Sequence, residues 1–185
     1  MPENRNILFI VIDQLRADCL TGALGEHVDL PNLRRFMKEA VTFKKHYSVT
    51  SPCGPSRASL LTGQYAMNHR SVRNGTPLRH DTPNLATELR KSGYLPMLFG
   101  YTDTSVDPRV YPAEDPALKC LESVMPGFHE MLEMRFEKSY PWLSHLAAQG
   151  YHFETRNDLY TPTSRLGRLP NRSAPALHTA QARAS

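Results

Sequence analysis

Cysteine is scarce in this chain of 185 residues, and no two cysteines lie close together in the sequence. The three that occur, Cys19, Cys53 and Cys120, form no Cys-x-x-Cys pair, which is the spacing that zinc sites and many redox motifs use. Their number and spacing therefore indicate neither a disulfide framework nor a zinc site. A reducing compartment is the simpler expectation.

Long hydrophobic runs are also missing. The apolar run near the start, residues 7–12, is too short for a membrane span or for the core of a signal peptide. The sequence therefore predicts a cytoplasmic protein with no membrane partner.

The chain also lacks the excess of basic residues that a nucleic-acid-binding surface needs. The formal net charge of +4 equals the charge of a C-terminal stretch, residues 161–185, which has four arginines and no acidic residue. The rest of the chain is formally neutral, and this argues against a nucleic-acid partner. The same stretch is rich in Pro, Ser, Thr and Ala and has no aromatic residue, so we predict that it is a disordered tail.

Strands alternate with helices in the remaining residues, 1–160, which we interpret as one domain. Residues 7–12 are continuously apolar and rich in β-branched side chains, as a parallel strand buried on both faces would be, and residues 95–99 predict a second buried strand. Helices are predicted over residues 31–40, 55–62 and 82–92, and residues 128–149 are predicted to be helical in parts, with a break at Pro141. This order predicts an α/β fold with a mostly parallel sheet and helices on both faces.

Cys53 stands where the second of these helices begins. Pro55 fits the first helical position, Arg57 follows in the first turn and Gly63 ends the segment. The free backbone N–H groups of a helix start favour negative charge, which suits a thiolate, a phosphate or a sulfate. A small buried cysteine is the structural alternative.

The motif around Cys53 is much more specific than a lone cysteine. Cys-x-Pro-Ser-Arg followed by Leu-Thr-Gly resembles the signature of the formylglycine-dependent sulfatases of the alkaline phosphatase superfamily. The neighbouring stretches Asp-Gln-Leu-Arg-Ala-Asp, Met-Asn-His-Arg and Asp-Pro-Arg are most similar to the phosphonate monoester hydrolase branch, and the similarity covers about residues 6 to 160. The resemblance implies an alkaline phosphatase-like fold, of which this chain holds the N-terminal part.

The resemblance also implies a set of cofactors. Cys53 would be oxidised to formylglycine by a formylglycine-generating enzyme, and the product would serve as both nucleophile and metal ligand. Asp13 and Gln14, at the end of the first predicted strand, would be further ligands of a divalent metal. Their oxygens are hard donors of the kind that Mg²⁺, Ca²⁺ and Mn²⁺ prefer. A carboxylate that caps a helix is the alternative for Asp13.

Three further positions are matched by the resemblance. Arg57 would hold the aldehyde hydrate and neutralise developing charge, while Asn74 and Tyr101 would contact the anionic group of the substrate. Asn74 precedes a glycine and is equally well explained as a turn residue, and Tyr101 as a residue that packs at a strand end. Related enzymes tend to carry a threonine where this chain has Asp103, so that contact is in doubt. The scattered histidines show no spacing that singles one out as an acid.

The implied reaction is hydrolysis of a small-molecule sulfate, phosphate or phosphonate ester. A hydroxyl of the formylglycine hydrate would attack sulfur or phosphorus, and the metal and Arg57 would stabilise the charge that builds on the oxygens. Related enzymes complete the metal site with an Asp-His or Asp-Asn pair from later in the chain, and no such pair follows Phe153 here. The alternative interpretation is a non-catalytic remnant or interaction module. An incomplete parallel sheet has an open edge, which favours association with another copy of the chain.

Overall fold

The computed structural model describes residues 5–135 and 138–151. The chain forms two compact units, one comprising Met1–His46 with Gly150–Ser185 and the other Tyr47–Gln149. Each unit is described by itself. The predicted tail, residues 161–185, lies outside the described residues.

In its described residues, the first unit contains two α-helices and a 3-10 turn. Helix α1 covers Asp18–Thr21, the turn η1 covers Ala23–Glu26 and helix α2 covers Pro31–Glu39. Pro31 stands at the start of α2, where its missing N–H costs nothing. The Arg34 guanidinium donates to the carbonyls of Gly25 and Val28, and thereby ties α2 to the segment before it. The prediction of a helix over residues 31–40 is confirmed.

The strand predicted over residues 7–12 is wrong for this structure. These residues form neither strand nor helix, and their six apolar side chains are between 44% and 85% exposed. A parallel strand is stabilised by backbone ladders to its neighbours and by packing on its faces, and β propensity alone does not replace them. The run lacks such a partner among the described residues.

Helices in the second unit begin and end where local signals place them. Helix α3 covers Cys53–Thr62 and stops at Gly63, whose φ of 68° is left-handed. Helix α4 covers Ala66–His69, and α5 covers Leu85–Lys91. Asn84 caps α5, because its side chain accepts from the N–H groups of Ala86 and Thr87. The two helices that the sequence predicts here, which correspond to α3 and α5, are confirmed. Pro55 is the third residue of α3 and not the first.

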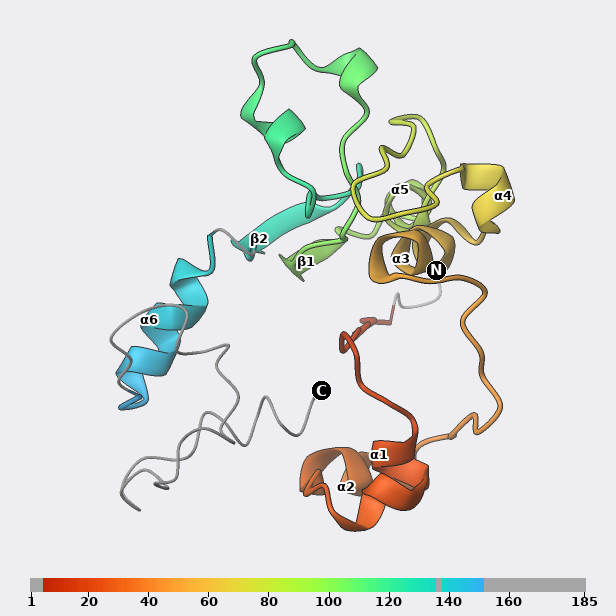
Figure 1. Ribbon diagram of the computed structural model, residues 1–185, viewed down its shortest axis with the longest axis vertical. Coiled ribbons are helices and arrows are strands. Elements are labelled where there is room, and N and C mark those ends of the chain that lie inside the picture. Colours follow the sequence, from red (N-terminus) through yellow and green to blue (C-terminus); the bar gives the residue numbers. More distant parts are fainter. Residues whose placement is uncertain (1–4, 136–137, 152–185) are drawn as a thin grey trace. The chain divides into compact units, whose positions relative to one another are not determined.

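The sheet of the second unit has two parallel strands that lie side by side (Figure 1). Strand β1 covers Met97–Gly100 and β2 covers His129–Glu133, with Met97 opposite His129. Strand β1 was predicted as buried, yet Phe99 is 68% exposed, because in the described residues nothing covers the face of the sheet to which Met97 and Phe99 point.

The helical prediction over residues 128–149 is half wrong. Its first part is β2, and only Tyr140–Ala148 is a helix, α6. Pro141 is the second residue of α6 and begins the helix instead of breaking it, since a proline fits the first turn of a helix without losing a hydrogen bond. Residues 136 and 137 of this segment lie outside the described residues.

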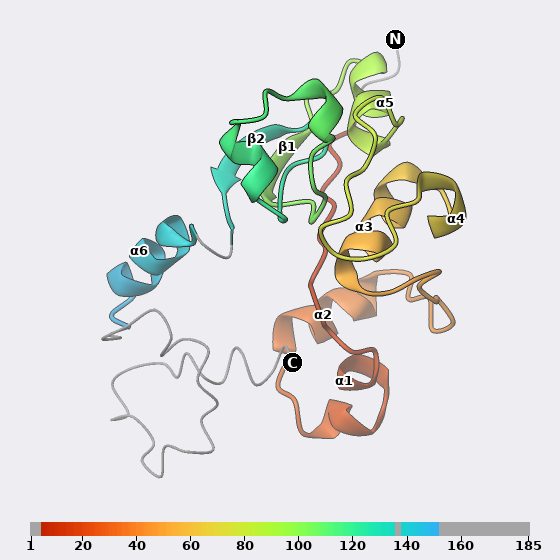
Figure 2. The ribbon, with the colours of Figure 1, turned by 45° about the horizontal axis from the view of Figure 1, so that its top comes forward.

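A long connection from β1 to β2 folds back toward α3 and closes the core. It contains two 3-10 turns, η2 at Pro108–Val110 and η3 at Pro116–Lys119. Leu61 of α3, Leu78 and Met125 form the buried core cluster, and Phe128 packs against it. Helices α3, α4 and α5 lie on the same side of the two strands in both views (Figure 2).

The fold class is therefore mixed α/β with a parallel sheet and helices, as predicted. None of the described helices has the length and apolar character that a membrane span requires.

Candidate functional site

Cys53 is the first residue of α3, and a carboxamide from a distant loop reaches it. The Nδ2 of Asn74 donates to Cys53 Sγ over 3.1 Å, and the Gly54 N–H donates to Asn74 Oδ1 over 2.9 Å. Asn74 therefore uses both ends of its side chain to hold the loop against the helix start. Asn74 also stands in a turn, as its alternative interpretation expects, because the Thr76 N–H donates to the Arg73 carbonyl over 3.0 Å.

Arg57 lies one turn further along α3 and meets the residue that follows β1. Its Nη1 donates to the backbone carbonyl of Tyr101 over 3.2 Å, and its guanidinium carbon lies 4.7 Å from the centroid of the Tyr101 ring. A guanidinium over an aromatic face is attracted by the negative face of the ring. The structure therefore brings together four predicted site residues, namely Cys53, Arg57, Asn74 and Tyr101.

The thiol of Cys53 is not activated, contrary to what a helix start beside an arginine suggests. Its pKa is raised, first by burial and then by a hydrogen bond to Asp103, and the Asn74 bond opposes the shift only in part. Burial disfavours the charged thiolate, and so does a neighbouring carboxylate. The unmodified side chain is therefore a neutral thiol at pH 7 and a weak nucleophile.

Asp13 and Gln14, the two predicted metal ligands, belong to the first unit. Both side chains are exposed and lie in a turn that precedes α1. The φ of Gln14 is 56°, a left-handed conformation that is uncommon for residues other than glycine and that concentrates at functional sites. In the part of the chain that the structure describes, no group of three or more His, Cys, Asp and Glu side chains could hold a metal ion.

His69, the histidine nearest in sequence to the Cys53 motif, has a structural position. Its Nδ1 accepts from the Ser71 N–H over 3.1 Å, and its Nε2 lies 2.9 Å from Ser59 Oγ. The Nδ1 bond requires an unprotonated Nδ1, so Nε2 carries the proton and donates to Ser59. Burial lowers the pKa of His69, in agreement with this neutral form.

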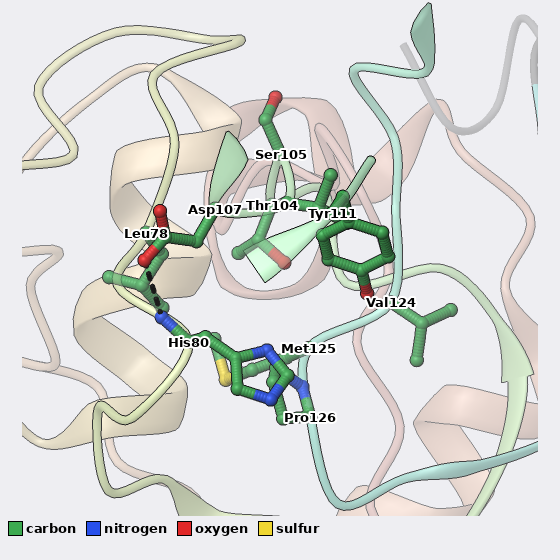
Figure 3. Close-up of a pocket in the computed structure, with 10 residues that line it drawn as sticks. Leu78, His80, Thr104, Ser105, Asp107, Tyr111, Val124, Met125 and Pro126 are labelled. Carbon is green, nitrogen blue, oxygen red and sulfur yellow. Dashed lines mark hydrogen bonds between the residues drawn. The ribbon is translucent and has the colours of Figure 1, made fainter. Parts of the chain in front are cut away.

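Two cavities lie near the loop after β1, and neither contains the four site residues. The first has a volume of about 20 Å³, enough for a water molecule and too little for an ester. Figure 3 shows its lining, in which the His80 N–H donates to Asp107 Oδ2 over 3.1 Å. The second is an open hollow of about 310 Å³ beside Arg79 and Arg109, and each of these arginines is paired with an aspartate at 2.5 and 2.6 Å.

Comparison with known proteins identifies the family. The family model for sulfatases matches residues 5–167. The chain belongs to the sulfatase family. Among curated members, it is 43% identical to the multifunctional alkaline phosphatase superfamily protein PehA of Trinickia caryophylli, over 85% of this chain and 32% of that protein. It is 32% identical to a choline-sulfatase of Rhizobium meliloti, over 51% of this chain and 19% of the other.

Solved structures agree with this assignment. The chain is 66% identical to the phosphonate monoester hydrolase of Silicibacter pomeroyi, with a TM-score of 0.80, over 94% of this chain and 34% of that one. The phosphonate monoester hydrolase of Agrobacterium radiobacter is 42% identical, with a TM-score of 0.71, over 85% and 31% of the two chains. This sulfatase-family chain therefore spans about a third of the length of these relatives. The predicted resemblance is confirmed at the level of the family and of its alkaline phosphatase-like relatives.

Asp103 is the residue of this sulfatase-family site that sequence reasoning passed over. It entered only as a departure from a threonine, whereas the residue is 8% exposed and contributes to the raised pKa of Cys53. Its φ is 56°, and aspartate is one of the few residues that tolerate this conformation. An aspartate between two threonines after a predicted strand is the only signal that could have drawn attention to it.

Proposed function

We propose that this sulfatase-family chain hydrolyses sulfate, phosphate or phosphonate esters of small molecules through a nucleophile at position 53. The observation that carries the proposal is the bond from Asn74 to Cys53 Sγ at the start of α3, one helical turn before Arg57, whose guanidinium binds the Tyr101 carbonyl. Family membership and the names of the phosphonate monoester hydrolase relatives support the same class of reaction.

The neutral thiol supports conversion of Cys53 over direct use of the cysteine. A thiolate nucleophile needs a lowered pKa, and the pKa of Cys53 is raised. Formylglycine, formed from Cys53 by a maturation enzyme, would supply a hydrated aldehyde whose hydroxyl is the nucleophile. The Asn74 amide would then orient an oxygen where it now donates to Sγ.

Arg57 has the chemistry to bind the anionic group that reacts. Its guanidinium is held from one side by the Tyr101 carbonyl and ring, which fixes its direction at little further entropic cost. A fixed cation beside the nucleophile stabilises the negative charge that grows on the oxygens of sulfur or phosphorus. Tyr101 is thus a positioning residue for Arg57.

The donor chemistry of Asp13 and Gln14 fits a hard divalent cation such as Mn²⁺, Ca²⁺ or Mg²⁺. Such an ion would supply Lewis-acid stabilisation of the substrate oxygens. Asp13 would contribute a carboxylate oxygen and Gln14 a carboxamide oxygen. We propose both as metal ligands.

The test is turnover by the full chain after expression with a formylglycine-generating enzyme and addition of Mn²⁺. We expect release of p-nitrophenol from a p-nitrophenyl sulfate, phosphodiester or phenylphosphonate, and loss of this release in Cys53→Ala. The matched control is Cys120→Ala, which removes a thiol of similar burial outside the site and should leave turnover unchanged. If a fully converted, metal-loaded chain releases nothing, the non-catalytic alternative holds instead.

A further inference from the structure

Asn74, whose carboxamide bonds to the nucleophile position, is also the asparagine of this chain that is most prone to lose its amide. Asparagine deamidates fastest when glycine follows it, because glycine adds no side chain beside the attacking nitrogen and lets the backbone rotate freely. No asparagine of the chain other than Asn74 precedes a glycine. Asn74 is exposed and Gly75 is partly buried, so water can reach the pair.

The reaction is an internal displacement that needs only water. The Gly75 N–H donates to no acceptor among the described residues. Its nitrogen would give the proton to solvent and attack Cγ of Asn74, while the bond from Cγ to Nδ2 breaks and Nδ2 takes up a proton and leaves as ammonia. Water then opens the resulting succinimide ring. Rupture of the new bond at Cγ gives aspartate, and rupture of the main-chain bond gives isoaspartate.

The turn around Asn74 holds the attacking nitrogen away from the carboxamide. The Thr76 N–H donates to the Arg73 carbonyl over 3.0 Å. Gly75 has a φ of 76°, whereas Asn74 is not among the described residues other than glycine with a positive φ. This is the pattern of a type II turn, in which the ψ of the second residue is about +120°. At that angle the Gly75 nitrogen stands over the α-hydrogen of Asn74 and not over its Cβ.

The start of α3 holds the carboxamide itself. Asn74 Nδ2 donates to Cys53 Sγ over 3.1 Å, and Oδ1 accepts from the Gly54 N–H over 2.9 Å. A Cβ on Gly54 would stand only 2.9 Å from Oδ1, so the carboxamide lies tightly against the helix start. Rotation of the carboxamide toward the Gly75 nitrogen breaks both bonds. Deamidation therefore requires a local opening of this turn away from α3.

We propose that the pair Asn74-Gly75 is a deamidation site, which the contact with residue 53 keeps closed. The rate of deamidation is the rate in the open turn multiplied by the population of the open turn. One ordinary hydrogen bond lowers such a population about fivefold. The acceptor at position 53 therefore sets how fast Asn74 is lost. The loss matters for the site, because a carboxylate has no N–H to donate to residue 53 and brings a negative charge to the start of α3.

The experiment follows the peptide that contains Asn74 by mass spectrometry while the full chain is incubated in mildly alkaline buffer. The chain is expressed without a maturation enzyme, so that residue 53 is a thiol. Wild type is compared with Cys53→Ala, which removes the acceptor, and with Cys53→Ser, which keeps an acceptor in nearly the same place. Wild type in urea gives the rate of the fully open chain. Asn68 and Asn84, which no glycine follows, are internal references in the same digest.

We expect Asn74 to deamidate before any other asparagine in urea and slowly in the folded wild type. Folded Cys53→Ala should deamidate about fivefold faster than wild type, and Cys53→Ser about as slowly as wild type. Equal rates in folded wild type and Cys53→Ala would overturn the proposal, and so would an Asn74 that survives in urea. Cys120→Ala is the matched control, because it removes a thiol of similar burial outside the site, and it should deamidate as wild type does.

Low concentrations of urea distinguish local opening from a general loss of stability in Cys53→Ala. Deamidation through local opening hardly depends on urea below the unfolding transition, whereas deamidation through global unfolding rises steeply with urea. An acceleration that rises steeply in this way would contradict the protective role of the Sγ bond. No step of the experiment uses ester hydrolysis, so its outcome is independent of the proposed function.

Discussion

The loop that follows β1 and the apolar segment at residues 7–12 differ in what they bury. Around the loop, Thr102, Asp103 and Thr104 are each 8% exposed or less, and hydroxyls and backbone groups pair with one another. In residues 7–12 the apolar side chains are 44% to 85% exposed. Polar residues are thus buried in the second unit, whereas the apolar residues 7–12 of the first unit are exposed. Burial here follows from partners and not from hydrophobicity alone.

The largest effect is expected when a buried apolar side chain is truncated, and truncation of an exposed apolar side chain provides the comparison. Met125 is 1% exposed in the core cluster, so Met125→Ala should lower the free energy of unfolding by about 2–5 kcal/mol. Ile10 is 68% exposed, so Ile10→Ala should change it by about 0.5 kcal/mol or less. Urea unfolding measures both. A cost for Ile10→Ala that matches Met125→Ala would break the contrast.

The next test removes a buried hydroxyl. Thr102→Val keeps the shape of the side chain and leaves the Met125 N–H and the Ser123 carbonyl without their partner. We expect a loss of about 1–3 kcal/mol in urea unfolding, since an unsatisfied buried group keeps its full desolvation cost. Thr42→Val, at an exposed position of the first unit, serves as control and should be nearly neutral. Equal small effects would mean that the hydroxyl pairs contribute nothing to holding Asp103.

A smaller effect is expected at the start of α5. Asn84 is 2% exposed, accepts from two backbone N–H groups and donates to the Pro126 carbonyl over 3.0 Å. Asn84→Ala should therefore cost about 1–2 kcal/mol, as the loss of a helix cap does. Asn32→Ala on α2, where the side chain is exposed, provides the comparison by the same unfolding assay. The capping account fails if both substitutions have the same effect.

The smallest expected effect is a pH dependence from His69. Burial lowers its pKa in the folded state, whereas in the unfolded chain it is about 6.5. Below about pH 6.5 the unfolded chain takes up a proton that the folded chain refuses, so stability is full above that pH and falls as the pH drops toward the folded pKa. Urea unfolding between about pH 7.5 and 5.5 should show this slope in wild type.

Two variants isolate that slope. His69→Gln should lose the part of it that comes from this residue, and His129→Gln, at an exposed position on β2, should retain it. A slope that survives in His69→Gln would show that other groups produce it.

Local signals were sufficient for α2, α3 and α5, and this explains which parts of the fold could be predicted. Pro31, Gly63 and Asn84 act on their own neighbours in the chain, so the ends of α2, α3 and α5 can be inferred from sequence. Strands depend on partners far away in the sequence. Residues 7–12 and residues 129–133 were therefore assigned wrongly, the first as a strand and the second as a helix.

The site residues likewise differ in whether local sequence signals could predict their proximity. Cys53 and Arg57 are one helical turn apart, so their proximity follows from the motif. The convergence of Asn74 and Tyr101 on them came from family resemblance, because no periodicity links positions 53, 74 and 101. The approach of the Asp103 backbone to the start of α3 was missed, since it depends on the absence of a side chain at Gly54 and on a left-handed backbone at Asp103.

The most direct test of the central claim is the chemical identity of residue 53. The full chain is expressed with a formylglycine-generating enzyme, digested, and the peptide that contains Cys53 is analysed by mass spectrometry, with the Cys120 peptide as an internal control. The account predicts that Cys53 is found with an aldehyde in place of its CH₂–SH group, and that Cys120 remains a thiol. An unmodified thiol at Cys53 throughout would contradict it.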